Sequence, residues 1–130
     1  GRAHFPDATA VFYIYKEVGD EEAATKLILV NDSKLVVKDA AADERKHNRS
    51  LIGIKYPVRL QLVTEEKIRL RMKQTEIVES SFFYLRFLSE MTLSLKDGKP
   101  RKGIGITEQL TPKALKYRWL DWISGIRIGR

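Results

Sequence analysis

Apolar and polar positions alternate over residues 58–62 and again over residues 67–73. The apolar positions are Val58, Leu60, Leu62, Ile68, Leu70 and Met72, and mostly cationic side chains stand between them. A period of two is typical of a strand with one buried and one exposed face. A Thr-Glu-Glu turn at 64–66 divides the pattern, so it predicts two antiparallel strands. A one-residue slip would turn the cations inward, and we therefore expect a fixed register.

Further segments rich in β-branched and aromatic residues predict more strands. These segments are 8–16, 26–30, 34–38, 51–54, 76–95 and 103–108. Asn31, Asp32 and Ser33 suit a tight turn, which indicates a hairpin at that point. Gly103 and Gly105 indicate a bend or a close approach of two backbones. The highly charged segment 39–50 has no large apolar residue, and we expect a helical turn or a loop there.

The period changes after residue 110. Thr111 is a good N-cap and Pro112 suits the first helical position, so a helix is predicted over 112–127. Its apolar stripe consists of Leu115, Trp119, Trp122, Ile123 and Ile126. We expect this stripe to pack against the strands. The flanking cations leave open an interfacial membrane helix as the alternative.

The predicted fold is mainly β, an antiparallel up-and-down meander over about residues 8–110 followed by one C-terminal amphipathic helix. The 130 residues suffice for one domain, 1–130, and one core. The sequence has no run of eighteen apolar residues and therefore predicts no transmembrane helix. The chain has no cysteine and no signal-peptide pattern, which leaves localisation open with a cytoplasmic preference.

Common catalytic motifs are absent from the sequence. It has no HExxH, no glycine-rich phosphate loop and no nucleophile elbow, and its two histidines, His4 and His47, lie in polar segments. These observations argue against classical hydrolase, NTPase and zinc chemistry. We expect no metal site and no cofactor.

A net charge of +7 makes an anionic partner plausible. The row Lys67, Arg69, Arg71 and Lys73 could follow a phosphate backbone. No aromatic residue stands in this row to stack bases, and pairing with nearby glutamates explains it equally well. A basic β module that binds nucleic acid or an acidic protein is therefore the alternative function.

The segment 83–91 carries candidate ligand-binding residues on both faces. Phe83 and Phe87 share one face, and Tyr84, Arg86 and Glu90 share the other. If the polar face points into a cavity, its buried groups would orient a ligand. If it points outward, it is an ordinary ladder of charges.

Glu108 ends the last predicted strand, on the same face as Ile104 and Ile106. We expect this apolar face to point inward. A carboxylate there would have a raised pKa and could act as a general acid or base. Alternatively, Glu108 caps the end of the strand or bonds to an arginine.

Two stretches carry a resemblance to a known family. Gly-Arg-Ala-His-Phe-Pro-Asp-Ala-Thr-Ala-Val-Phe-Tyr-Ile-Tyr at 1–15 and Gly-Ile-Gly-Ile-Thr-Glu at 103–108 resemble the C-terminal lipocalin-like domain of carotenoid 1,2-hydratases and AttH-like proteins. The resemblance implies a lipocalin-like barrel, an N-terminal sister domain and a cavity for an apolar polyene or polyketide-like molecule. It places Glu108 at the glutamate that ends the family's glycine strand. The family's aromatic-rich segment before that strand is absent from 96–102, so the resemblance leaves catalysis open.

Overall fold

The computed structural model describes residues 1–15, 21–81, 83–96 and 98–110, and in these it contains eight strands and no helix. The strands are β1 (Arg2–His4), β2 (Thr9–Tyr15), β3 (Ala24–Asn31), β4 (Lys34–Arg49), β5 (Lys55–Thr64), β6 (Arg69–Ser80), β7 (Tyr84–Ser94) and β8 (Pro100–Leu110). The helix predicted over 112–127 lies outside the described residues.

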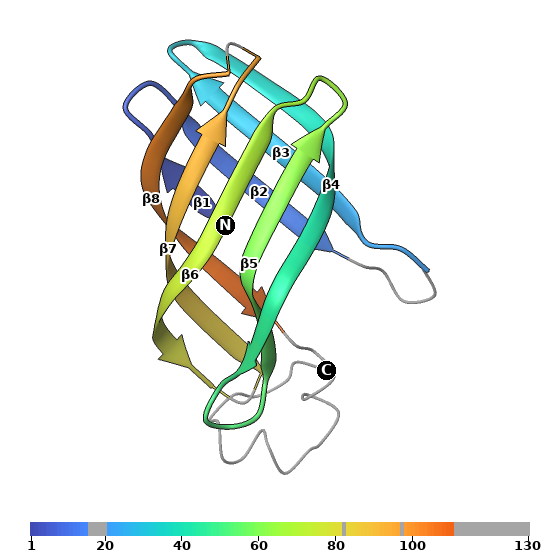
Figure 1. Cartoon of the computed structure of the whole chain (residues 1–130), viewed down its shortest axis with the longest axis vertical. Coiled ribbons are helices and arrows are strands. Elements are labelled where there is room, and N and C mark those ends of the chain that lie inside the picture. The colour runs from blue at the N-terminus through green and yellow to red at the C-terminus, as the bar shows by residue number, and fades with distance from the viewer. Residues whose placement is uncertain (16–20, 82, 97, 111–130) are drawn as a thin grey trace, which may run out of the picture.

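The eight strands form one closed antiparallel barrel (Figure 1). Each strand pairs with its neighbours in sequence, and β1 closes the barrel by pairing with β8, where Ala3 lies opposite Gly105. The predicted antiparallel meander is therefore confirmed. The alternation over 58–73 is confirmed as well, because Leu60, Leu62, Leu70 and Met72 are buried.

The main error of the sequence-based prediction concerns residues 39–54. The segment 39–50 was expected as a helical turn or loop, but β4 continues to Arg49 and pairs with β5 from Ala40 onward. Residues 51–54, expected as a strand, form the turn at the tip of this hairpin. Pairing with a strongly β-prone partner strand thus outweighs the weak β propensity of the charged segment.

One half of the barrel interior is filled by a hydrophobic core. It consists of Ala3, Phe5, Ala10, Phe12, Leu27, Leu29, Leu60, Leu62, Leu70, Met72, Met91 and Leu93. The short strand β1 fits against β8 only because β8 has glycines there. A Cβ atom on Gly105 would lie 2.4 Å from the carbonyl oxygen of Arg2, and one on Gly103 would lie 2.3 Å from that of His4. The close backbone approach predicted from these glycines is confirmed.

Strands β5 and β6 separate toward the other half of the barrel (Figure 1). Their pairing ends at Arg59 and Lys73. Beyond this point β5 pairs with β4 alone, and β6 pairs with β7 alone. The two strands diverge at the half of the barrel that holds the cavity described next.

Candidate ligand cavity

A cavity of about 700 Å³ occupies this half of the barrel. Its apolar wall includes Phe12 and Ile14 of β2, Leu60 of β5 and Phe87 of β7. An eight-stranded barrel has an interior that either fills with side chains or holds one small ligand. The volume falls within the range of about 300–1,000 Å³ that is usual for small-molecule sites. The cavity can therefore accommodate one small organic molecule.

A hydrogen-bonded cluster of three polar side chains lies on the inner face of the barrel beside the cavity. The hydroxyl groups of Ser89 and Thr107 each donate to Oε1 of Gln74, at 2.5 Å, and the two hydroxyl oxygens are 3.0 Å apart. Gln74 and Thr107 line the cavity. In the described part of the chain the amide nitrogen of Gln74 has no partner. It can donate a hydrogen bond to a ligand, since an amide carries two N–H donors.

The cavity rim carries charged and titratable groups. Nε2 of His47 lies 3.2 Å from Oε2 of Glu44, and both residues line the cavity. Lys55 and Gln109 also line it, and Nε2 of Gln109 donates to the carbonyl oxygen of Lys55 at 2.8 Å. This last contact joins β5 to β8 across the cavity. The rim is thus polar, whereas the wall behind it is apolar.

Three of the predicted site residues meet on the outside of β7 and β8, near the rim. Nε of Arg86 lies 2.9 Å from the hydroxyl oxygen of Tyr84 and 3.1 Å from Oε1 of Glu108. Nη1 of Arg86 also lies 3.1 Å from Oε2 of Glu79. Because Tyr84 and Arg86 belong to the outward face of β7, they form a ladder of charges and do not line the cavity. Glu90, farther along the same face, is exposed and lies opposite Lys73.

The expected inward orientation of Glu108 is wrong. Ile104 is 63% exposed and Glu108 is exposed, whereas Gly105 and Thr107 point inward and are buried. Small residues are required on the inward face of β8, because β1 approaches it closely. Hydrogen bonding to the Tyr84 hydroxyl, followed by the contact with Arg86, holds the pKa of Glu108 below its ordinary value. Glu108 nevertheless reaches the cavity rim.

The two phenylalanines proposed as ligand contacts have different positions. Phe87 is 1% exposed and forms part of the cavity wall. Phe83 is half-buried and precedes β7 without lining the cavity. Only Phe87 is therefore placed to contact a ligand.

The basic row of Lys67, Arg69, Arg71 and Lys73 lies on the outer surface of the barrel. Arg69, Arg71 and Lys73 are on the outward face of β6, and Lys67 lies in the turn before it. None of the four forms an ion pair with any residue that the structure describes, so the suggested pairing with glutamates is not observed. A groove of about 290 Å³ lies beside the row, lined by Asp43, Arg45, Arg59, Leu60, Gln61, Arg71 and Met72.

Sequence reasoning missed most of the polar groups of the cavity. Ser89 follows Gln74 by 15 residues, and Thr107 follows Ser89 by 18 residues. Only the register of β6, β7 and β8 brings the three side chains together. Glu44 and His47 were missed because their segment was interpreted as a loop. A signal was present for Ser89, since it is the polar residue at an inward position of an otherwise apolar face of β7. No such signal marks Thr107, because its face of β8 also carries Arg101 and Gln109.

Two other kinds of feature are absent from the described part of the chain. No group of three His, Asp or Glu side chains there could hold a metal ion. No helix among the same residues is long and apolar enough to cross a bilayer. Comparison of the whole chain with protein-family models, with curated proteins and with solved structures found no match.

Proposed function

We propose that the barrel binds an apolar small molecule that carries one polar head group. The observation that supports this function best is the cavity of about 700 Å³, with an apolar wall and the Gln74–Ser89–Thr107 cluster beside it. Ligand sites typically combine a mostly apolar lining with a few convergent polar groups. This cavity has both.

The polar cluster favours a head group that accepts hydrogen bonds. Both hydroxyl groups are directed at Oε1 of Gln74, which fixes the amide and leaves its N–H groups for the ligand. A carbonyl or carboxylate oxygen would suit these donors. A ligand without such a group would leave the buried cluster facing an apolar surface, which is unfavourable.

The resemblance to carotenoid hydratases adds a preference for a polyene body, and we include this in the proposal. Binding is better supported than hydration. Hydration of an alkene would need an acid to protonate the double bond, and a carboxyl with a lowered pKa, as in Glu108, is ionised at neutral pH. The sister domain implied by the same resemblance stays a prediction.

A titration with parinaric acid tests the proposal, because this fluorescent fatty acid combines a polyene with a carboxylate. We expect saturable binding with one molecule per chain, and weaker binding of its methyl ester. Ile14→Trp places a large ring in the cavity wall and should abolish binding. Ile106→Trp makes the same change on the outer face of β8 and should leave it intact. Absence of saturable binding by the folded wild-type chain would exclude the proposed function.

A second candidate function rests on the groove beside the basic row. Arg59 lies between Arg45 and Lys73 on three neighbouring strands, and like charges in this arrangement are destabilising. Arg45 is paired with Asp43 at 2.7 Å, whereas Arg59 and Lys73 form no ion pair with a described residue. A nucleic-acid backbone or an acidic protein surface would relieve their repulsion. For single-stranded nucleic acid, the logarithm of the binding constant should fall with that of the salt concentration, with a slope of about −0.7 per contacted phosphate. Arg59→Gln and Arg71→Gln should each reduce this slope, and a flat salt response would exclude nucleic acid.

A further inference from the structure

The tip of the β4–β5 hairpin presents two large apolar side chains to solvent. Leu51 is 108% exposed relative to an extended reference chain, and Ile52 is 44% exposed. Isolated surface leucines are common in proteins, but a fully exposed leucine beside an isoleucine at the end of a projecting hairpin requires an explanation.

Hydrogen bonds hold this tip in one conformation. The backbone N–H of Ser50 donates to the carbonyl oxygen of Ile54 at 2.9 Å, and the N–H of Gly53 donates to that of Ser50 at 2.9 Å. The N–H of Ile54 also donates to the buried hydroxyl of Ser50 at 3.1 Å. Gly53 has a φ of +86°, which glycine adopts without strain. The exposure of Leu51 is therefore built into an ordered turn.

The charged residues nearest the tip, on both strands of the hairpin, are cationic, and the first acidic residues along β4, counted back from the tip, are Glu44 and Asp43. Residues 45–64 contain five Lys or Arg residues and no Asp or Glu. These are Arg45, Lys46, Arg49, Lys55 and Arg59, of which Arg45 forms an ion pair with Asp43 at 2.7 Å. An apolar tip with a basic collar combines the two interactions that hold peripheral proteins on anionic bilayers, namely apolar insertion and attraction to head groups.

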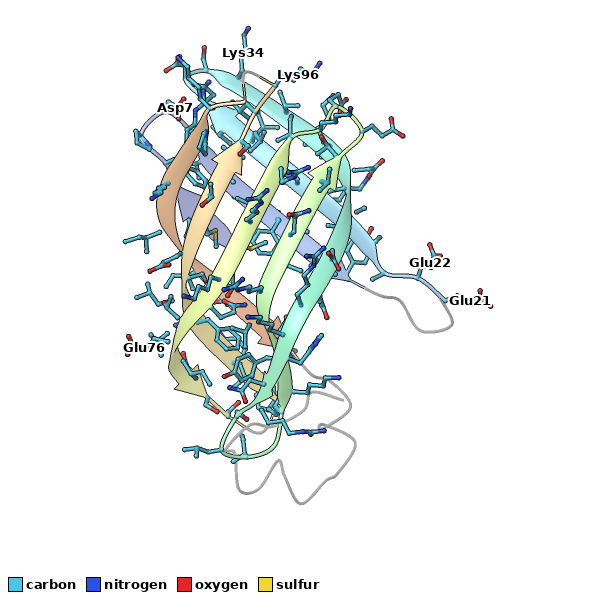
Figure 2. The ribbon with its side chains drawn as sticks, viewed as in Figure 1. Asp7, Glu21, Glu22, Lys34, Glu76 and Lys96 are labelled. Atoms are coloured by element: carbon cyan, nitrogen blue, oxygen red, sulfur yellow. The ribbon has the colours of Figure 1, made fainter. Side chains whose placement is uncertain are left out.

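The hairpin lies at the same end of the barrel as the cavity. His47 and Lys55, on its two strands, both line the cavity. The turns between β3 and β4 and between β7 and β8 lie at the opposite end (Figure 1), where Figure 2 labels Lys34 and Lys96. A surface that contacts the β4–β5 tip is therefore close to the cavity rim.

We propose that the β4–β5 hairpin docks the barrel on an anionic lipid bilayer, with Leu51 and Ile52 inserted and the cavity rim next to the membrane. The apolar ligand then exchanges directly between the bilayer and the cavity, and this last step rests on the proposed function. Lipid is favoured over nucleic acid at this site because a phosphate backbone offers no apolar medium for Leu51 and Ile52. An acidic protein partner is an outcome of the test below, since it would leave vesicle binding absent.

Sedimentation with lipid vesicles tests the docking. The full chain should bind vesicles made of equal parts phosphatidylserine and phosphatidylcholine, and should bind pure phosphatidylcholine much more weakly. Replacing both Leu51 and Ile52 by Glu should reduce binding by at least about tenfold. Lys46→Gln should reduce it about fivefold. Replacing both Leu35 and Val37 by Glu, and Lys34→Gln, make matched changes toward the opposite end of the barrel and should have little effect.

A fluorescence measurement locates the contact. Since the chain has no cysteine, Leu51→Cys and Leu35→Cys each allow a single environment-sensitive label to be attached. The label at position 51 should shift to the blue on anionic vesicles, and the label at 35, a position that is 65% exposed, should not.

Three results would overturn the docking proposal. The first is no binding to anionic vesicles, and the second is equal binding by the wild type and by the variant in which Leu51 and Ile52 are both replaced by Glu. The third is complete loss of binding in Lys46→Gln where a reduction of about fivefold is expected, which would indicate a purely electrostatic contact. The parinaric acid titration in the absence of vesicles decides the cavity separately. The variant with Glu at 51 and 52 should still bind parinaric acid, which also establishes that it is folded.

Discussion

The aromatic ring of Tyr56 lies against the ring of Phe87, with 4.8 Å between the ring centroids and 46° between the ring planes. Tyr56 belongs to β5 and Phe87 to β7, so this contact spans the place where β5 has separated from β6. Tilted aromatic pairs contribute about 0.5–1.5 kcal/mol beyond the area they bury. The pair therefore replaces lost strand pairing beside the cavity.

Phe87→Ala should destabilise the barrel by about 3–5 kcal/mol, since it removes a buried aromatic ring and the contact with Tyr56. The free energy of unfolding in urea measures this loss. Tyr13→Ala removes a ring of similar size that is 52% exposed, and its effect should be much smaller. Equal losses in the two variants would contradict a supporting role for the pair.

Thr107→Val removes one hydroxyl group from the polar cluster and keeps the shape of the side chain. Gln74 and Ser89 then lose a partner, which should reduce stability by about 1–3 kcal/mol. Because Thr107 helps to orient Gln74, the variant should also lose the preference for parinaric acid over its methyl ester. Thr92→Val is the control, since Thr92 makes no hydrogen bond through its side chain to another described residue. An unchanged preference would separate the cluster from ligand recognition.

A strand could be predicted from the sequence on one condition, namely that one of its faces is apolar and the other polar. The alternation over 58–73 meets this condition, because Leu60 and Leu70 point inward while Arg59 and Arg71 point to solvent. Strand β4 does not meet it. Its inward positions beyond Lys38 include Ala40 and Ala42, which give no hydrophobic signal, and its strand conformation comes from pairing with β5.

The sequence indicates correctly which residues of β8 share a face, but the face that was expected to point inward points outward. Ile104 and Ile106 look like core residues in the sequence, yet the interior at this point has room only for Gly103 and Gly105, since the backbone of β1 lies against them. Closure of the barrel is a tertiary property. No local pattern in β8 specifies which face will meet β1.

Gly105→Ala should weaken the closure of the barrel between β1 and β8. The added methyl group would lie 2.4 Å from the carbonyl oxygen of Arg2 and 2.7 Å from Cε of Met91, so the backbone of β1 must move. We expect a loss of about 1–3 kcal/mol, as for other overpacked sites. Amide hydrogen exchange should accelerate in β1 first. Ile106→Ala, on the outer face of the same strand, should leave this exchange slow, and slow exchange in Gly105→Ala would show that β1 adapts.

The pKa of Glu108 gives a prediction about pH. The largest cause of its lowered pKa is the hydrogen bond with the Tyr84 hydroxyl, and the Arg86 guanidinium acts in the same direction. A carboxyl group whose pKa is lower in the folded chain stabilises the fold above its ordinary pKa of 4.5, and this contribution is lost as the pH falls through the folded value. Tyr84→Phe and Arg86→Gln should each raise the pKa of Glu108, as measured by carboxyl NMR titration. They should also make the free energy of unfolding less dependent on pH between neutral and acidic conditions.

Lys102→Gln is the control for Arg86→Gln. It removes the same charge from a residue of β8 that does not bond to Glu108. If Lys102→Gln raised the pKa of Glu108 as much as Arg86→Gln does, net charge would be the cause, and the role of the local contacts would be refuted.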